Sequence, residues 1–346
     1  MNQLHCKACF AHQKQDIRID ERTLEYSEDQ VVVKVEAGGI CGSDIHYYQE
    51  GHAGLSILKH PMVIGHEFSG VVHIAPKNST LKVGCKVAVN PSQPCNQCQF
   101  CLEGKQNVCS NMRFMGSAQF NPHVDGGFSE FVVVSEQQCY PYDPQIDSKI
   151  MAFSEPTAVA IHAINVAGSL VGKKVLVIGA GPIGGLIIAA AKASGASEVI
   201  ASDVSERCRE IALQMGANKV LDASNSHDLL AYQEDKGYFD VTFEASGSSI
   251  AISASVDMTK RNGIVVQVGM GKNTVEYPVA KMLVKEISWK GSFRFIDEFA
   301  TAVTWLQNGI IDPRPLISGS YPYQEIEKAL LQAADKTVSS KVLVTF

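Results

Sequence analysis

The stretch PCNQCQFCLEGKQNVC contains four cysteines within sixteen residues. They are Cys95, Cys98, Cys101 and Cys109, with the spacing C-x2-C-x2-C-x7-C. Four thiolates this close in sequence can close a tetrahedral shell around one zinc ion, and a closed shell leaves no position for substrate or water. We therefore predict a structural zinc lobe at about residues 91–111, in preference to four unliganded thiols, and any metal-assisted chemistry needs ligands elsewhere.

Two other stretches contain residues that could bind a metal ion used in catalysis. They are GGICGSDIH around Cys41 and GHEFSG around His66. A thiolate, an imidazole and a carboxylate make a mixed shell that can leave one coordination position open. The residue types alone do not distinguish a metal site from ordinary structural residues. A single cysteine is also a common small core residue, and a single histidine is a common loop residue.

A third stretch, VLVIGAGPIG, has the glycine spacing of dinucleotide-binding turns. Gly179, Gly181 and Gly184 follow the apolar run 175–178 and open a predicted helix with Pro182 near its start. Glycines allow the tight turn and the close approach of a pyrophosphate, which the helix N-terminus then stabilises. The alternative is a structural glycine turn without a ligand.

The strand after this helix ends at Asp203, about twenty residues beyond the last glycine. A carboxylate at this place would bind the hydroxyl groups of the adenosine ribose. It would also repel a 2′-phosphate, which favours NAD over NADP. Arg207 lies close by in the sequence and weakens that exclusion, so NADP remains possible.

Two kinds of pattern along the chain would position these residues. Residues 30–39, 68–75, 84–91 and 126–135 are short β-rich runs between turn residues, which is typical of a β-barrel-like domain. From about residue 155, strands and helices alternate, which predicts a doubly wound parallel sheet. The last segment, from about 294, reads as two helices and a closing strand KVLVTF.

Composition narrows the class of protein. The 346 residues are 45% hydrophobic and 19% charged, which is ordinary for a globular protein long enough for two domains. The net charge of −6 argues against nucleic acid as a partner. No long apolar run predicts a membrane span, and the N-terminal residues do not read as a signal peptide. With ten cysteines, this favours a cytoplasmic protein with reduced thiols and metal ligands.

The motifs GGICGSD, GHEFSG, the four-cysteine lobe and VLVIGAGPIG, in this order, resemble the zinc-containing medium-chain dehydrogenase/reductase family. The resemblance implies an α/β fold with a GroES-like β-barrel catalytic domain at 1–153 and a doubly wound Rossmann domain at 154–293. Residues 294–346 would return to complete the catalytic domain. The stretch SEPTAVAIHA resembles the polyol (sorbitol) dehydrogenase branch, because Glu155 stands where alcohol dehydrogenases usually have a cysteine ligand.

The resemblance also implies two zinc ions per chain, one structural and one catalytic. The catalytic ion would be held by Cys41, His66 and either Glu67 or Glu155, and both glutamates stay open. The alternative for Glu155 is a carboxylate placed by a helix dipole. Ser43 would take the proton of the alcohol, and His46 would receive it through the cofactor ribose at the surface. The alternative for His46 is an ordinary loop histidine.

The resemblance implies further contacts with cofactor and substrate. The additional cofactor residues would be Ile183, Ser246, Val268, Gly269, Met270, Phe293 and Arg294. Tyr47 would line the substrate pocket. A sugar-acid carboxylate would be matched by the planar fork of an arginine, for which Arg294 and Arg113 are the candidates.

The expected activity is the oxidation of a secondary alcohol of a small-molecule sugar acid or polyol, with zinc as Lewis acid and a nicotinamide as hydride acceptor. A sorbitol-, xylitol- or threonine-type dehydrogenase is the alternative among enzymes. A nucleotide-binding sensor without turnover is the alternative from another class. A sensor would not need the full set of Cys41, Ser43, His46, His66 and Glu155. We also expect a homo-oligomer, tetramer or dimer, with neither a membrane nor nucleic acid as partner.

Overall fold

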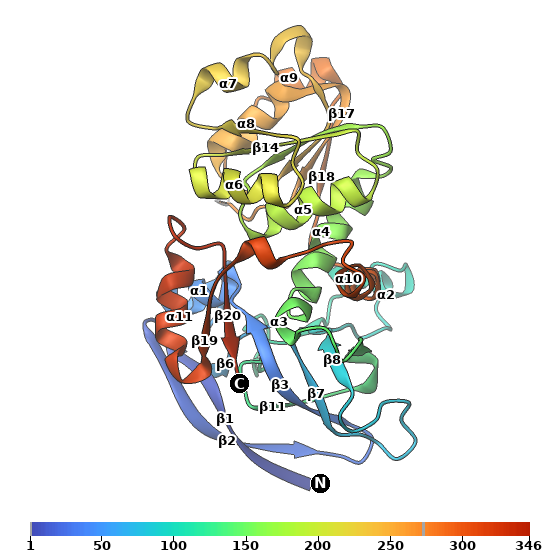
Figure 1. Ribbon diagram of the computed structural model, residues 1–346, viewed down its shortest axis with the longest axis vertical. Coiled ribbons are helices and arrows are strands. Elements are labelled where there is room, and N and C mark those ends of the chain that lie inside the picture. The colour runs from blue at the N-terminus through green and yellow to red at the C-terminus, as the bar shows by residue number, and fades with distance from the viewer. Residues whose placement is uncertain (1, 272–273) are drawn as a thin grey trace. The chain divides into compact units, whose positions relative to one another are not determined.

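The computed structural model describes residues 2–271 and 274–346 and divides into two compact units (Figure 1). The first unit comprises the residues up to Glu155 together with Phe299–Gly309 and Ile317–Phe346. The second comprises Pro156–Glu298 and Ile310–Leu316. The domain bounds expected from the sequence, after residues 153 and 293, stay predictions.

The first unit is built on a seven-stranded sheet with the order β12-β8-β7-β3-β20-β19, in which β11 also pairs with β3. The strands are β3 (Val31–Gly39), β7 (Glu67–Ile74), β8 (Lys86–Val89), β11 (Phe131–Val134), β12 (Cys139–Pro141), β19 (Ile317–Pro322) and β20 (Lys341–Thr345). The four β-rich runs of the sequence correspond to β3, β7, β8 and β11. Valines of β3 such as Val33 and Val35 are fully buried against Phe68, as expected for β-branched residues in a sheet core.

The C-terminal strand completes this sheet. β20 pairs antiparallel with β3, so that Leu343 lies opposite Gly39, and β19 runs parallel to β20. In Figure 1 the red β20 accordingly lies beside the blue β3. Residues more than 300 positions apart are therefore neighbours at the end of β3, next to Cys41.

A long N-terminal hairpin was not anticipated from the sequence. It consists of β1 (Asn2–Gln13) and β2 (Asp16–Tyr26), and β1 also pairs with β6 (Met62–Val63). The buried residues of β1 include Cys6, Ala8, Cys9 and Ala11. These small side chains do not produce the alternation of large apolar and polar residues by which a strand is usually identified.

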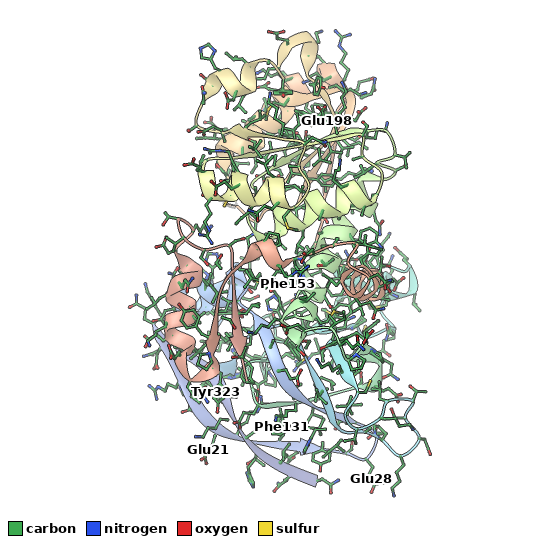
Figure 2. The ribbon with its side chains drawn as sticks, viewed as in Figure 1. Glu21, Glu28, Phe131, Phe153, Glu198 and Tyr323 are labelled. Atoms are coloured by element: carbon green, nitrogen blue, oxygen red, sulfur yellow. The ribbon has the colours of Figure 1, made fainter. Side chains whose placement is uncertain are left out.

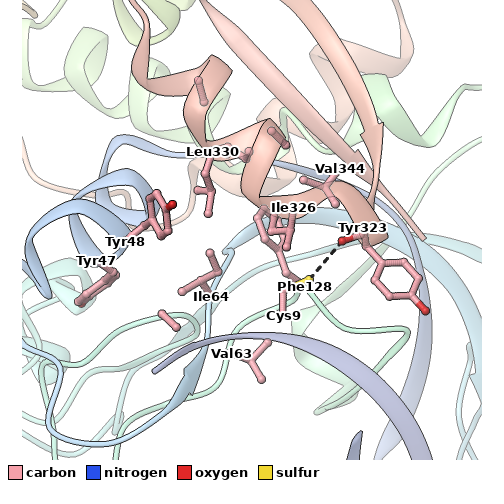
Figure 3. Packing of buried hydrophobic residues seen from close by; sticks show 14 of the residues in the cluster. Cys9, Tyr47, Tyr48, Val63, Ile64, Phe128, Tyr323, Ile326, Leu330 and Val344 are labelled. Atoms are coloured by element: carbon pink, nitrogen blue, oxygen red, sulfur yellow. Dashed lines mark hydrogen bonds between the residues drawn. The ribbon is translucent and has the colours of Figure 1, made fainter. Parts of the chain in front are cut away.

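The first unit also contains several helices and short strands. The helices are α1 (Gly42–Glu50), α2 (Gln99–Leu102), α3 (Ser148–Met151), most of α10 (Glu298–Gln307) and α11 (Ile326–Ala334), while α4 (Ser154–Ala167) starts here and continues in the second unit. Short strands are β4 (His52–Ala53), β5 (Ser56–Ile57), β9 (Ser92–Gln93) and β10 (Arg113–Phe114). Figure 3 shows Ile326 and Leu330 of α11 in one core cluster with Tyr47 and Tyr48 of α1.

The second unit is a six-stranded, fully parallel sheet with the order β15-β14-β13-β16-β17-β18. Its strands are β13 (Lys174–Ile178), β14 (Glu198–Asp203), β15 (Lys219–Asp222), β16 (Phe239–Glu244), β17 (Thr259–Gln267) and β18 (Ser288–Gly291). Its further helices are α5 (Pro182–Ala193), α6 (Glu206–Gln214), α7 (Ser226–Leu230), α8 (Ser249–Met258) and α9 (Val279–Lys285). The strand order reverses between β13 and β16, which is where doubly wound sheets bind ligands.

Among the described residues, one stretch, Ser148–Ala167, is long and apolar enough to cross a membrane by length and composition. However, 78% of its 18-residue apolar window is buried inside the protein. Burial to this degree is what a core helix of a globular protein shows, so the stretch carries no indication of a membrane span.

Candidate zinc and dinucleotide sites

The four cysteines of the lobe meet as the spacing predicts. Their sulfur atoms all lie within 4.8 Å of one another, with Cys95 and Cys109 3.5 Å apart and Cys98 3.6 Å from Cys101. Two thiolates on one tetrahedral zinc ion at about 2.3 Å are themselves about 3.8 Å apart. The cluster therefore fits a zinc ion and, with four protein ligands, leaves no open position.

Backbone N–H groups of the lobe point at its sulfur atoms. Cys98 stands immediately before α2, and hydrogen bonds from the N–H groups of Cys101 and Ser110 lower the pKa of its thiol to about 6. Cys109 Sγ accepts from the N–H of Asn111 at 3.4 Å. Such donors favour the thiolate, which is the form that binds zinc.

A second cluster combines three different ligand types. The ligand atoms of Cys41, His66 and Glu67 lie within 4.8 Å of one another. Cys41 is the residue before α1, His66 directly precedes β7 and Glu67 is its first residue. His66 and Glu67 are buried. A thiolate, an imidazole and a carboxylate here fit a zinc ion that keeps a position for a further ligand.

Asp44 joins the two chain segments that carry these ligands. Its carboxylate, which is fully buried, accepts from the N–H of Cys41 at 2.9 Å and from the N–H of Gly65 at 3.0 Å. One side chain thus fixes the backbone on both sides of the cluster. Sequence reasoning did not single out Asp44, although an acid three residues after a helix N-cap is a recognisable capping signal.

The two candidate glutamates stand in different surroundings. Both oxygens of Glu67 accept from Nζ of Lys341, at 2.7 and 2.6 Å, and Lys341 also donates to the carbonyl of Ile40 at 3.0 Å. Glu155, near the start of α4, lies outside the three-residue cluster but close enough for His66 and Glu67 to affect its pKa. Burial is the larger influence and raises the pKa of Glu155 to about 8.

Lys341 is a second functional candidate, besides Asp44, that the sequence analysis did not predict. It is only 3% exposed, and burial alone would lower its pKa, but Glu67 and Cys41 raise it above its ordinary value. A buried ammonium group with a bidentate carboxylate partner is costly to build, so its place beside metal ligands is notable. The only signal in the sequence is a lysine at the first position of the apolar strand KVLVTF.

The two residues of the expected proton relay lie on α1. Ser43 is half-buried, whereas the side chain of His46 is 56% exposed, with Nδ1 3.3 Å from a carboxylate oxygen of Glu50. The ring of Phe114 packs 5.4 Å from that of His66 and shields one side of the imidazole. The arrangement puts a titratable group at the surface near the cluster, and the relay itself stays a prediction.

The glycine turn of the second unit has the geometry that its sequence predicts. Gly179 has φ +87°, and a Cβ on Gly184 would stand 1.8 Å from the carbonyl oxygen of Gly179. Only glycine fits at these two positions. α5 begins at Pro182, with Ile183 next, so the helix N-terminus faces the turn that would receive a pyrophosphate.

Asp203 ends β14, as expected, and its carboxylate is anchored to the glycine turn. One oxygen accepts from the N–H of Ala180 at 2.7 Å and the other from the N–H of Ser205 at 2.8 Å. Arg209 donates to the carbonyl of Asp203 at 2.9 Å. The carboxylate therefore lies beside the turn, and Arg207 follows it in α6.

The remaining cofactor candidates follow the strands beyond the switch point. Ser246 follows β16, Val268, Gly269 and Met270 follow β17, and Phe293 and Arg294 follow β18. The first four stand at the carboxyl ends of neighbouring parallel strands, at the edge where such sheets bind ligands. Arg294 has φ +55° and its guanidinium lies 4.8 Å from the centre of the Phe293 ring.

The substrate candidates of the first unit are placed differently from one another. Tyr47 is 2% exposed, and its hydroxyl oxygen accepts from the N–H of Ala118 at 2.9 Å, within the core cluster of Figure 3. Arg113 donates to the carbonyl of Pro122 at 3.3 Å. Neither hydrogen bond shows whether the residue binds a substrate. The assignments of Tyr47 and Arg113 to the substrate pocket therefore stay predictions.

Comparisons with known proteins agree with this reading. Residues 27–144 match the family model of the alcohol dehydrogenase GroES-like domain, and residues 182–308 match that of zinc-binding dehydrogenases. The chain is 46% identical to L-idonate 5-dehydrogenase (NAD(P)+) of Escherichia coli K12 over 344 residues, covering 99% of this chain and 100% of that protein.

Solved structures give the same result. The crystal structure of L-idonate 5-dehydrogenase from Escherichia coli K-12 superposes with a TM-score of 0.96 at 45% identity, covering 100% of this chain and 99% of that chain. An alcohol dehydrogenase of Escherichia coli CFT073, solved with NADH, superposes with a TM-score of 0.90 at 29% identity, covering 99% of each chain.

These matches confirm the predicted fold, a GroES-like barrel with a Rossmann domain, and the predicted cofactors, zinc and NAD(P). The family models cover the segments that carry the two metal clusters and most of the doubly wound sheet. The chain belongs to the zinc-containing medium-chain dehydrogenase/reductase family of NAD(P)-dependent enzymes.

Proposed function

We propose that this protein oxidises L-idonate at C5 to 5-keto-D-gluconate, reversibly, with NAD or NADP. The observation that carries a dehydrogenase function is the buried cluster of Cys41, His66 and Glu67, which can hold zinc and still accept a further ligand. The full-length likeness to an L-idonate 5-dehydrogenase supports the choice of a sugar acid over a neutral polyol.

We assign the direct carboxylate ligand of the catalytic zinc to Glu155. Both carboxylate oxygens of Glu67 accept hydrogen bonds from Lys341. If Glu67 moved to the metal, the buried ammonium group of Lys341 would lose its partner, which is costly. Among the described residues, Glu155 is buried without an ion pair of its own and lies near His66. Cys41, His66 and Glu155 would then bind the metal. Glu67 would stay paired with Lys341 beside these ligands and would not bind the metal directly.

Bound in these sites, zinc supplies Lewis acidity toward the alcohol and the nicotinamide supplies the hydride acceptor. The protein contributes orientation and a route for the proton. Ser43 takes the proton of the substrate hydroxyl, and the exposed imidazole of His46 delivers it to water. Phe114 keeps water away from one side of His66.

Binding of the cofactor follows from the second unit. The turn at Gly179–Gly184 receives the pyrophosphate, and Asp203 binds the ribose hydroxyls while its other contacts hold the turn closed. Ser246, Val268, Gly269 and Met270 border the nicotinamide. Arg207, near Asp203 in sequence, gives NADP a cation for its 2′-phosphate.

We also propose that the protein is a cytoplasmic homo-oligomer. β18 is an edge strand of the six-stranded sheet, and the neighbouring α9 exposes Val279, Leu283 and Val284. An open strand edge beside exposed apolar side chains favours association with a second copy. The domain bounds at residues 153 and 293 belong to the same proposal.

The test is a comparison of oxidation rates for L-idonate, D-gluconate, sorbitol, xylitol and L-threonine with each dinucleotide. We expect L-idonate to have the highest kcat/KM. Replacing Arg294 with alanine should lower kcat/KM for L-idonate by about tenfold to a hundredfold, with little effect on a neutral polyol, because a carboxylate partner is lost. If wild-type enzyme does not turn over L-idonate, the sugar-acid assignment fails.

If the loss is equal for acid and polyol, Arg294 serves the cofactor instead. If neither substrate is affected, Arg113 is the better candidate for the carboxylate. The matched control is Arg314→Ala, since Arg314 forms an exposed pair with Asp312 and is not one of the candidate site residues.

A further inference from the structure

A buried carboxylate stands at the proposed nicotinamide side of the Rossmann sheet, and none of the roles above uses it. Glu244 is the last residue of β16 and is 0% exposed. β16 lies next to β13, across the point where the strand order reverses. The side chain is therefore at the carboxyl edge of the sheet, where doubly wound folds bind their ligands.

Glu244 connects two loops of this edge. Its oxygen Oε1 accepts from the N–H of Ser246 at 2.9 Å and from the hydroxyl of the same serine. Oε2 accepts from the N–H of Gly247 at 3.0 Å and from the side-chain amide of Gln267 at 2.5 Å. Its backbone carbonyl accepts from the N–H of Gly269 at 2.9 Å. One residue thus fixes both loops that carry proposed cofactor contacts.

The same loops touch the glycine turn. A Cβ on Gly179 would lie 2.8 Å from the backbone nitrogen of Ser246, so the turn and the loop after β16 are in close backbone contact. A Cβ on Gly269 would lie 2.3 Å from the nitrogen of Gly247. Glu244, which accepts hydrogen bonds from Ser246, Gly247 and Gly269, therefore supports the backbone that lies against the glycine turn.

The hydrogen bonds indicate that Glu244 is ionised. Gln267 Nε2 also lies 2.8 Å from the carbonyl oxygen of Gly269, which can only accept. This contact fixes the amide with its nitrogen toward both oxygens, so Oε2 of Glu244 acts as an acceptor. Both oxygens of Glu244 thus accept hydrogen bonds, which is the pattern of an ionised carboxylate, an acceptor without a proton to donate.

Among the described residues, no lysine, arginine or histidine forms an ion pair with Glu244. The charge of Glu244 is therefore compensated by hydrogen-bond dipoles, and because the side chain is fully buried, water screens this charge only weakly. The oxidised nicotinamide ring is cationic and the reduced ring is neutral, while the rest of the dinucleotide is unchanged. A fixed negative charge here distinguishes the two forms.

We propose that Glu244 is a positioning residue of the cofactor site whose negative charge favours the oxidised dinucleotide over the reduced one. This inference rests on the proposed placement of the nicotinamide beside Ser246 and Gly269. It assigns two tasks to one side chain: the hydrogen bonds shape the wall, and the charge biases the bound cofactor toward the form that accepts a hydride.

The test measures dissociation constants of NAD+ and NADH for the full, zinc-loaded chain by calorimetry. In Glu244→Gln, the ratio of the NAD+ constant to the NADH constant should rise about tenfold, since one nearby charge is removed from a low-dielectric site. Glu198→Gln is the matched control. Glu198, labelled in Figure 2, begins β14 at the opposite, amino edge of the same sheet, and the ratio should stay unchanged.

Equal weakening of both forms, or no change in either, would overturn the electrostatic role and leave the proposed dehydrogenase function intact. Binding of neither form by wild-type chain would overturn the dinucleotide site itself. Should Glu244→Gln fail to fold, Gln267→Lys neutralises the charge without replacing Glu244, and the same tenfold rise is expected. An unchanged ratio in that variant would equally contradict the proposal.

Discussion

The two metal clusters of this protein are built in opposite ways. The lobe takes four ligands of one type from fifteen consecutive residues, and its sulfur atoms meet around short turns. The other cluster brings together Cys41, His66 and Glu67 from two separate segments of the chain, with Glu155 nearby at the start of a third. The first site is local and closed, whereas the second is assembled by the tertiary fold and open.

This difference explains what each site needs from the rest of the chain. Backbone N–H groups within the lobe donate to the sulfur atoms of Cys98 and Cys109, so these contacts need no other part of the chain. The open site requires Asp44 to join two ligand segments and Lys341 to hold Glu67, and Lys341 comes from the last strand. A catalytic site that depends on the completed barrel cannot bind substrate before the chain has folded.

The largest expected effect is on activity. Cys41→Ser should lower kcat/KM at least about a thousandfold, because weakening one ligand of an open shell removes Lewis-acid assistance worth several kcal/mol. The four-thiolate zinc and the thermal midpoint should be nearly unchanged. Cys85→Ser is the control, since Cys85 is half-buried and belongs to neither cluster. Activity within tenfold of wild type would contradict the catalytic assignment.

The lobe should respond in the opposite sense. Cys98→Ser opens the four-thiolate shell, so we expect one zinc ion fewer per chain and a free energy of unfolding lower by more than about 4 kcal/mol. Turnover per folded chain should stay within a few-fold of wild type. Chemical denaturation and metal analysis measure both effects. A folded variant with the activity loss of Cys41→Ser would show that the lobe is more than structural.

The ion pair of Lys341 and Glu67 gives a test of how the open site depends on the rest of the barrel. Lys341→Met should lower the free energy of unfolding of metal-free chain by about 3–5 kcal/mol, because it leaves a buried carboxylate without its cation. Zinc should restore part of that loss, since Glu67 can then turn to the metal. Denaturation with and without zinc measures the difference, and equal losses in both states would contradict the coupling of Lys341 to the metal site.

A buried pair outside both clusters gives the smallest effect and serves as reference. Glu298 accepts from His162 and Asn165, each at 2.9 Å. Burial would raise the pKa of Glu298, but these bonds and the N–H of Ile296 outweigh it and hold the pKa at about 2. Glu298→Gln should therefore lower the free energy of unfolding at neutral pH by about 1–2 kcal/mol, with or without zinc.

The pH dependence of this reference pair follows from the lowered pKa. The stabilisation is fully present above the ordinary carboxyl pKa of 4.5 and is lost as pH falls from there to about 2. Wild type and Glu298→Gln should consequently converge in stability across that window. A difference that persists unchanged at the acid end would show that the pair stabilises the protein in some other way.

The sequence predicted the local features well and the assembled ones less completely. The geometry of Cys95–Cys109 and of Gly179–Gly184 could be predicted from their spacing alone, because short turns decide it. The roles of Lys341 and Asp44 were not predicted, because their partners are brought to them by strand pairing and loop packing with distant parts of the sequence. The N-terminal hairpin was not predicted for a different reason. Its buried residues, such as Ala8 and Cys9, are too small to produce the apolar pattern of a buried strand face.

The most direct test of the central claim is metal analysis of the full chain before and after mild chelation. Two zinc ions per chain are expected in protein purified without chelator. Chelation should remove one ion together with all activity, because three protein ligands and an exchangeable position hold metal less firmly than four thiolates. Added zinc should restore both. Full activity with a single zinc ion per chain would contradict the division into a closed structural site and an open catalytic one.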